Sequence, residues 1–343
     1  MRTGRIGAAP PAAVFVKLPE ARGRSGRSPL VRVHLSPNAQ IGQVSPISDL
    51  RGTCEAMATH MASHSPLLAE SLRQLGVSET AVIRQIDVHK FQEGSFQYIF
   101  RVSVQLAEGS APDICLVVSK ESEVNPLTQQ EFGNIRKYAK VNSSFIVEPL
   151  AIGELQTNRG NLAMYSTRFY PDYHELGYKV DGIQGRVGFH LHGPNVRNPE
   201  GLISFNAQQQ RELLVEITSI LTAYFDEETG SVPEGITVNA GDYIVRPRPD
   251  GGFDVRMVTV RTTFGEDRTD TKMNVALFFR KLVGFYVPID CYVVILMDQE
   301  IIHEGILRGL QKKGLTQSAA RQKLEEWERW YRMLAAAGTL NTV

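Results

Sequence analysis

The chain has 343 residues, of which 37 are basic and 37 acidic, so its length permits a core that divides into two lobes and its formal net charge is zero. Balanced charge provides no general attraction to nucleic acid or to an anionic membrane, and we expect neither as a partner. The three cysteines are too few and too scattered for a disulfide framework, which indicates a reducing compartment and a cytoplasmic protein.

Residues 1–50 contain seven Arg or Lys residues against two acidic ones, with several Pro and Gly residues among them. Such a segment cannot bury enough apolar surface to offset its ordering entropy, so we expect a disordered basic tail. An organelle transit peptide is the alternative, because the segment is rich in Arg and poor in acids. Residues 51–78 carry apolar side chains at helical separations, from Met57 to Leu75, and predict a helical N-terminal extension.

Beyond this extension the apolar residues alternate with period two. Residues 82–88 and 98–104 predict two strands, and the connector between them contains Gly94, which is a hairpin signal. A third run over residues 113–119 predicts a strand that ends at Lys120.

A helix is predicted next, over residues 129–141, because a proline precedes it and its apolar residues share one face. Glu131 lies in its first turns. Two further strands are expected at residues 145–152 and 162–169. The predicted order is therefore strand, glycine turn, strand, strand with lysine, helix with glutamate, strand and strand.

This order is similar to the small lobe of the protein-kinase-like fold, in the branch of the aminoglycoside phosphotransferases and choline kinases. Four segments resemble that family's phosphate-covering turn, lysine strand, glutamate helix and interlobe hinge, in that order: residues 91–102, 117–120, 130–136 and 167–172. The resemblance implies a two-lobed α+β fold. Residues 79–172 would form an N-lobe with a small antiparallel sheet and one main helix, and residues 173–343 a mostly helical C-lobe.

The resemblance also implies roles for individual residues. Backbone amides of the turn at Gly94 and Ser95 would approach phosphate oxygens, Lys120 would neutralise them, and Glu131 would hold the lysine. With Thr167 at the hinge, these residues imply a site for ATP or another nucleotide. Each part alone has a plainer interpretation: an ordinary hairpin loop, a solvated strand-end lysine, and a helix-start carboxylate favoured by the macrodipole.

In that family the catalytic pattern His-Gly-Asp-x-His-x-x-Asn follows a helix, and a similar helix is predicted here over residues 209–225. The segment after this helix departs from the family's pattern. Alignment on the apolar strand after the loop puts Thr237 at the base aspartate, Asn239 at the second histidine and Asp242 at the metal-binding asparagine. Thr259 replaces the metal-holding aspartate after the next strand. Because Mg²⁺ prefers carboxylate and phosphate oxygens, we expect its binding by Asp242 to be weak or absent.

Other residues leave alternatives open. Four acidic residues lie in or after the strand that leads to Thr259: Asp254, Glu266, Asp267 and Asp270. One of them could supply a displaced carboxylate, although a solvated acidic loop is the simpler interpretation. His190 and His192 would share one face of a strand and could bind a metal, but no third ligand follows at a recognisable spacing.

Three more segments carry expectations. Residues 182–201, rich in Gly, Asn and Pro, predict a loop inserted into the family's pattern. Residues 275–297 are apolar but are interrupted by charged residues and a proline, which favours a buried helix over a membrane span. Residues 316–336 predict a helix capped by Thr316, whose apolar face serves core packing or a partner surface.

We therefore expect a degenerate phosphotransferase-like protein, a pseudokinase, that binds a nucleotide or only acts as a scaffold. A protein partner or a small-molecule ligand would occupy the cleft between the lobes. The alternative is an active small-molecule phosphotransferase of the aminoglycoside or choline kinase type, with an atypical metal site at Asp242. Whether the chain is an enzyme stays open, because Thr237 and Thr259 replace the catalytic aspartates. An unrelated α+β fold is a third alternative.

Overall fold

The structure of the chain is a computed structural model. It describes residues 13–15, 30–34, 47–63, 65–94, 96–181, 186–191, 203–233, 240–261, 263–264, 270–282, 284–287, 293–296 and 298–338. Two compact units make up the chain: unit 1 contains Met1–Phe132 and Pro149–Tyr170, and unit 2 contains Gly133–Glu148 and Pro171–Val343. Both contain helices and strands, so the α+β class predicted from the sequence is confirmed.

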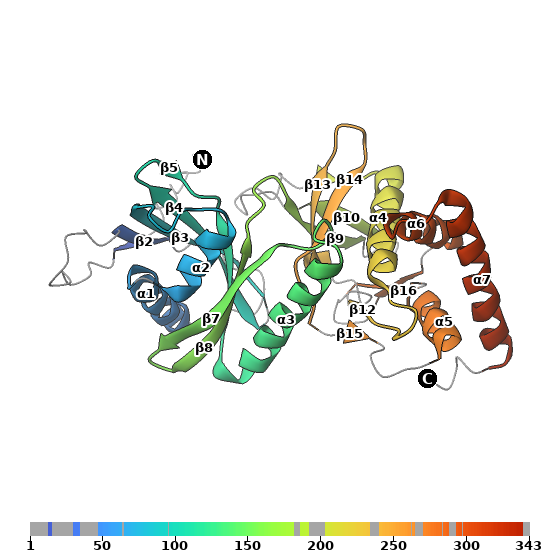
Figure 1. Ribbon diagram of the computed structural model, residues 1–343, viewed down its shortest axis with the longest axis horizontal. Coiled ribbons are helices and arrows are strands. Elements are labelled where there is room, and N and C mark those ends of the chain that lie inside the picture. The colour runs from blue at the N-terminus through green and yellow to red at the C-terminus, as the bar shows by residue number, and fades with distance from the viewer. Residues whose placement is uncertain are drawn as a thin grey trace, which may run out of the picture. The chain divides into compact units, whose positions relative to one another are not determined.

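Unit 1 is built on one mixed sheet with the strand order β1-β2-β3-β4-β6-β8-β7, and β5 pairs with β4 (Figure 1). Its strands are Ala13–Phe15 (β1), Leu30–His34 (β2), Ile83–Glu93 (β3), Gln97–Leu106 (β4), Gly109–Ser110 (β5), Ile114–Ser119 (β6), Pro149–Thr157 (β7) and Gly160–Arg168 (β8). Neighbouring strands are antiparallel except β2 and β3, which are parallel. The alternating patterns correctly predicted β3, β4, β6 and β8, whereas β7 begins four residues later than expected.

The helices of this part of the chain are Ile47–Ala62 (α1), Pro66–Gln74 (α2) and Asn125–Val141 (α3), of which α3 begins in unit 1 and ends in unit 2. α1 and α2 pack on one face of the sheet, where Met57 and Leu68 join a core cluster with Phe100 and Leu116. The first turns of α3, which belong to unit 1, pack on the other face, where Thr128 and Glu131 contact Gln97 and Phe132 contacts Tyr165. Buried residues alternate with more exposed ones along β4, because successive side chains point to opposite faces of the sheet.

The N-terminal segment differs from the disordered tail expected over residues 1–50. Residues 30–34 form β2, and Val31 is buried in the unit 1 core. β1 pairs with β2, and α1 begins at Ile47 rather than after residue 50. Within β2, Val31 and Val33 alternate with polar residues, so this short stretch forms a strand although the segment as a whole is basic.

His60, near the end of α1, makes stability depend on pH. Its Nε2 lies 2.6 Å from Oγ of Ser65, the residue that caps α2 by accepting a hydrogen bond from the Leu68 amide. Burial lowers the pKa of His60 below its usual value of 6.5. The folded protein therefore binds this proton less readily than the unfolded chain, so stability is complete above the unfolded pKa and declines as the pH falls toward the folded pKa.

We expect the His60→Gln variant to lose this part of the pH dependence. Urea denaturation between about pH 7.5 and pH 5 would show a falling midpoint for the wild-type protein and a flatter profile for the variant. A variant whose midpoint falls as steeply as that of the wild type would show that other groups cause the dependence.

The main sheet of unit 2 is antiparallel, with the strand order β11-β10-β9-β13-β14. Its strands are His174–Asp181 (β9), Arg186–Leu191 (β10), Ile203–Ser204 (β11), Tyr243–Pro247 (β13) and Phe253–Met257 (β14). Two short antiparallel pairs accompany it: Val232–Pro233 (β12) with Thr263–Phe264 (β15), and Gly284–Val287 (β16) with Val293–Leu296 (β17).

This sheet corrects two expectations. The inserted loop expected over residues 182–201 contains β10, which pairs antiparallel with β9 along six residue pairs. Val187, Phe189 and Leu191 alternate with less apolar residues, and this period-two pattern favours a strand. The buried helix expected over residues 275–297 ends at Leu282, and the rest of the stretch contains the β16–β17 pair. Residues 284–287 and 293–296 are rich in β-branched and aromatic side chains, which favour strands. The C-terminal part is therefore less helical than predicted.

The helices of unit 2 are Ala207–Tyr224 (α4), Thr271–Leu282 (α5), Gln299–Lys312 (α6) and Gln317–Ala336 (α7). α4 and α7 are confirmed as predicted. Asn206 and Gln209 form a reciprocal capping box at the start of α4, and Thr316 caps α7 by accepting from the Ala319 amide. α6 packs along α4 and was not predicted (Figure 1). Within the described ranges, every helix is too short or too polar to cross a membrane.

Candidate functional site

The turn between β3 and β4 is the segment that resembles a phosphate-covering loop. β3 ends at Glu93, β4 begins at Gln97, and the Gly94 amide donates a hydrogen bond to the Gln97 carbonyl oxygen at 2.9 Å. A Cβ atom at Gly94 would lie 3.7 Å from that oxygen, which is an ordinary contact. Packing within the turn therefore does not demand glycine, although its missing side chain leaves the backbone open to a ligand. Ser95 lies outside the described residues.

Lys120 lies beside this turn, because its amide donates a hydrogen bond to the Phe96 carbonyl oxygen at 3.0 Å. It continues the alternation of β6, so its side chain leaves the strand on the face of Val118, which α1 and α2 cover. Glu131, which was expected to hold this lysine, lies instead on α3 against the opposite face of the sheet. Its Nζ lies 5.3 Å from the centroid of the Tyr98 ring, and Nζ of Lys90 lies 5.6 Å from the same centroid. Two cations therefore share the electron-rich ring of one buried tyrosine.

Glu131 lies on α3, and its side chain is fully buried. Oε2 of Glu131 accepts a hydrogen bond of 2.7 Å from Nε2 of Gln97. The same amide nitrogen donates to Oγ1 of Thr128 at 3.1 Å, and Thr128 also accepts from Oγ of Ser119 at 2.8 Å. Burial of a carboxylate costs free energy unless hydrogen bonds compensate it, so this buried polar network fixes α3 against β4 and β6.

Gln97 is the functional candidate in this region that the sequence did not reveal. It lies between Gly94 and the buried Tyr98, at the first position of β4. Its side chain is 8% exposed, which is unusual for glutamine. Gln97 is polar, follows a predicted glycine turn and lies on the opposite face of the strand from Tyr98. This combination is the signal that could have identified it.

Thr167, the hinge candidate, lies at the other end of β6. It is a Cα partner of Cys115 on β6, whereas Gln97 is the partner of Ser119. Cys115 and Ser119 are four residue steps apart along the strand, which corresponds to about 13 Å. Thr167 is buried. Burial raises the pKa of the Cys115 thiol to about 11, and a hydrogen bond with Thr167 partly opposes this rise.

The sheet face between these two ends is only partly covered within unit 1. Ile99, Arg101 and Cys115 keep intermediate exposure on the face that α3 shares, whereas Ser119 is fully buried there. The Arg101 guanidinium pairs with Asp113 at 2.5 Å. Ile99, Arg101 and Cys115 therefore form a partly exposed strip, which offers apolar and cationic groups between the glycine turn and the hinge segment.

In unit 2 the structure brings two of the expected catalytic positions together. The Val258 amide donates a hydrogen bond to the Asp242 carbonyl oxygen at 2.9 Å, so Asp242 lies beside the segment that carries Thr259. Asp242 is buried. Burial, followed by the negative charge of Asp242, raises the pKa of the neighbouring Tyr243. Thr237 and Asn239 lie outside the described residues.

Glu175 on β9 is an acidic neighbour that the sequence did not reveal. A Cβ atom at Gly241 would lie 3.0 Å from Oε1 of Glu175, so this carboxylate lies close to the backbone just before Asp242. The register explains the proximity, since Glu175 is the Cα partner of Ile244 on β13. No sequence motif marks Glu175, and the two positions are far apart in the chain.

The other acidic and histidine candidates have structural roles or lie outside the described residues. Asp254 pairs with Arg246, and Asp270 accepts hydrogen bonds from the Lys272 and Met273 amides at the start of α5. His190 is buried in β10. Glu266, Asp267 and His192 are outside the described residues. Among the residues that the structure describes, no group of three or more His, Cys, Asp or Glu side chains could hold a metal ion.

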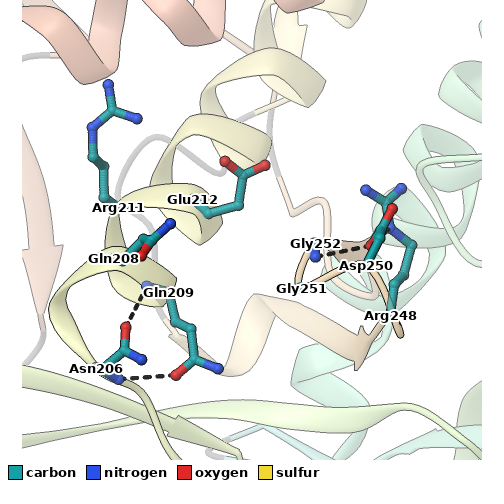
Figure 2. Close-up of a pocket in the computed structure, with 9 residues that line it drawn as sticks. All are labelled: Asn206, Gln208, Gln209, Arg211, Glu212, Arg248, Asp250, Gly251 and Gly252. Atoms are coloured by element: carbon teal, nitrogen blue, oxygen red, sulfur yellow. Dashed lines mark hydrogen bonds and ion pairs between the residues drawn. The ribbon is translucent and has the colours of Figure 1, made fainter.

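A polar pocket of about 470 Å³ lies within unit 2, between the first turns of α4 and the β13–β14 turn (Figure 2). Its lining residues are Asn206, Gln208, Gln209, Arg211, Glu212, Arg248, Asp250, Gly251 and Gly252. The charged groups are matched by neighbours, as in the Arg248–Asp250 pair at 3.2 Å. The Gly252 amide also donates to Asp250 at 3.0 Å. The pocket can hydrogen-bond a polar ligand but presents no excess of either charge.

No protein-family model matches the chain, and no curated protein matches its sequence.

Proposed function

We propose that this chain is a degenerate phosphotransferase-like protein of the protein-kinase-like fold, which binds a nucleotide through unit 1 and acts through a partner protein. The observation that carries the proposal is the arrangement of β3, β4, β6, β8 and β7 in one sheet, with α3 connecting β6 to β7. This is the chain order that the resemblance requires: a hairpin with a glycine turn, a lysine strand, a glutamate helix and two further strands.

The contacts at the turn support the same function. The backbone amides of Gly94 and Lys120 and the Glu131 carboxyl group come from three separate elements, yet each makes a hydrogen bond with residue 96 or 97. Thr167 lies further along the sheet, with the partly exposed strip between it and the turn. A nucleotide whose phosphates lie against the glycine turn would lie along this strip, and its base would reach toward the hinge segment.

The order of elements in unit 2 also supports the resemblance. α4 precedes the segment with Asp242, and the β13–β14 pair follows it and leads to Thr259. Phosphoryl transfer depends on metal ions that neutralise the transferred group. Thr259 has no carboxylate for such an ion, and Thr237 would be a poor general base. We therefore propose binding without efficient turnover.

An active small-molecule phosphotransferase with an atypical metal site is the second candidate. The observation that favours it is the Glu175 carboxylate next to Gly241, which adds a second acid near Asp242. Carboxylate oxygens suit Mg²⁺, and two of them with substrate phosphate would resemble its usual surroundings. Glu175 and Asp242 would hold the ion, which would supply charge neutralisation.

Thermal unfolding with ATP tests the proposal. With EDTA present and ATP at about 100 times its Kd, mass action should stabilise the protein by about 2.7 kcal/mol, which raises the unfolding temperature by roughly 5–10 °C. The Arg101→Met variant should lose most of this rise, because the Arg101 guanidinium lies on the strip along which the nucleotide would lie. The matched control is Lys140→Met, because Lys140 is exposed near the end of α3.

The alternative outcomes separate the candidates. A rise that requires Mg²⁺, disappears in Asp242→Asn and Glu175→Gln variants, and accompanies phosphate transfer to a small molecule would favour the active enzyme. An equal rise in the Arg101→Met variant would place the nucleotide elsewhere. No rise with ATP, ADP or GTP in either buffer would refute nucleotide binding.

A further inference from the structure

Gln97 occupies a junction of three elements within unit 1. Its backbone carbonyl oxygen accepts the Gly94 amide of the turn. Its side-chain amide donates to Glu131 and to Thr128 on α3. Thr128 in turn accepts from Ser119 at the end of β6. One residue therefore touches the turn through its main chain and α3 through its side chain.

The hydrogen bond to Glu131 is the shortest of these contacts. It spans 2.7 Å from the amide nitrogen to the carboxyl oxygen, and Gln97 is almost completely buried. Buried hydrogen bonds resist breaking because the group left behind loses its solvation without compensation. A shift of the turn would therefore either break the Gln97–Glu131 hydrogen bond or move Glu131 with it.

We propose that Gln97 is a positioning residue that couples the turn at Gly94 to the first turns of α3. In this arrangement an uncharged amide links Glu131 to the turn. Ligand contact at the turn then orders the first turns of α3, and displacement of these turns loosens the glycine turn. The ligand-driven part of this inference rests on the proposed function, whereas the mechanical link between turn and helix does not.

Amide-resolved hydrogen exchange of the full chain without ligand tests the link. In the Gln97→Met variant, which keeps the side-chain length and loses the donor, protection should fall by about tenfold or more both at Gly94 and at residues 129–132. The matched control is Gln105→Met on the same strand, because Gln105 is exposed and should leave both regions unchanged. Loss of protection at only one of the two regions, or at neither, would overturn the coupling.

A second variant keeps the test valid if Gln97→Met destabilises all of unit 1. Gln97→Glu places two carboxyl groups in contact, and they can share one proton when the pH is low. Like charge and burial raise the folded-state pKa of this pair above the unfolded value of about 4.3. Protection should therefore be restored at both regions together as the pH falls from 7 toward about 4.5, and lost again as it rises. Recovery at one region alone would contradict the coupling.

ATP then tests the ligand-driven part. In the wild-type protein, ATP should increase protection at Gly94 and at residues 129–132, and in Gln97→Met it should increase protection at the turn alone. If ATP changes protection at neither region of the wild-type protein, the proposed function is refuted. The result without ligand would still show whether Gln97 couples the turn to α3. Increased protection of α3 in the variant would show that the signal does not pass through Gln97.

Discussion

Replacement of Trp327 by alanine should destabilise the protein by about 3–5 kcal/mol, as expected for a large aromatic side chain removed from a packed core. Trp327 on α7 is completely buried. Its ring lies 5.5 Å from Phe225, 6.1 Å from Phe278 and 6.4 Å from Phe279, each in an edge-to-face arrangement. These partners come from the end of α4 and from α5, so one side chain joins three helices of unit 2.

Chemical denaturation followed by circular dichroism measures this effect, and Trp330→Ala is the matched control. Trp330 lies one helical turn further along α7, is partly exposed, and has Nζ of Lys323 at 5.7 Å from its ring. Its removal should cost about 1 kcal/mol or less. Because both variants put alanine into the same helix, the change in helix propensity cancels. Equal losses in the two variants would contradict the central role of Trp327.

A Trp327→Phe variant separates packing from hydrogen bonding. Nε1 of Trp327 donates to Oε2 of Glu227 at 3.1 Å, and Glu227 also pairs with Lys323 at 2.7 Å. Glu227 therefore keeps a partner when the indole is removed. We expect Trp327→Phe to cost clearly less than Trp327→Ala, because packing dominates.

Strands β3, β4, β6 and β8 of unit 1 could be predicted because each places apolar residues in the core. In β4, Tyr98, Phe100, Val102 and Val104 are buried and alternate with more exposed residues, which produces the period-two pattern. The same pattern does not reveal which face a helix covers. Ser119 and Lys120 are adjacent, and only the register of β6 against β4 and the packing of α3 determine that Ser119 contacts Thr128. The sequence therefore identified the elements of the site better than the direction of its side chains.

The apolar stretch over residues 275–297 shows a different limit. Its first part forms α5 and its second part the β16–β17 pair, because a short apolar run suits either a buried helix or a buried strand. The tertiary structure decides between them. Glu175 was missed for a related reason, since its proximity to Gly241 arises from the pairing of β9 with β13. A contact between distant segments leaves no local pattern.

The contact between α4 and α6 leads to the second large effect, in Gly309→Ala. A Cβ atom at Gly309 would lie 2.6 Å from the Ser219 carbonyl oxygen and 2.4 Å from Cβ of Thr222, both on α4. Neither atom is the end of a flexible side chain, so the helices must separate. We expect a loss of about 1–3 kcal/mol from this overpacking, although alanine is intrinsically the better helix former.

The separation would also weaken ion pairs that the close approach permits. Arg308 pairs with Glu212, and Nζ of Lys312 donates to Glu216 and, at 2.7 Å, to Ser219. Burial lowers the pKa of Lys312, so this cation relies on its partners on α4. Gly309→Ala therefore disturbs the packing of the helices and their electrostatic contacts together.

The matched control for Gly309→Ala is Gly133→Ala on α3, where nothing lies within 4 Å of the added Cβ atom. There alanine should stabilise the protein by about 0.5–1 kcal/mol, because it reduces the conformational freedom of the unfolded chain without a clash. The same substitution in two helices should thus have opposite signs. Denaturation followed by tryptophan fluorescence measures both, since Trp327 and Trp330 lie in unit 2 with these positions. A stabilising Gly309→Ala would show that α6 does not approach α4 as closely as its glycines allow.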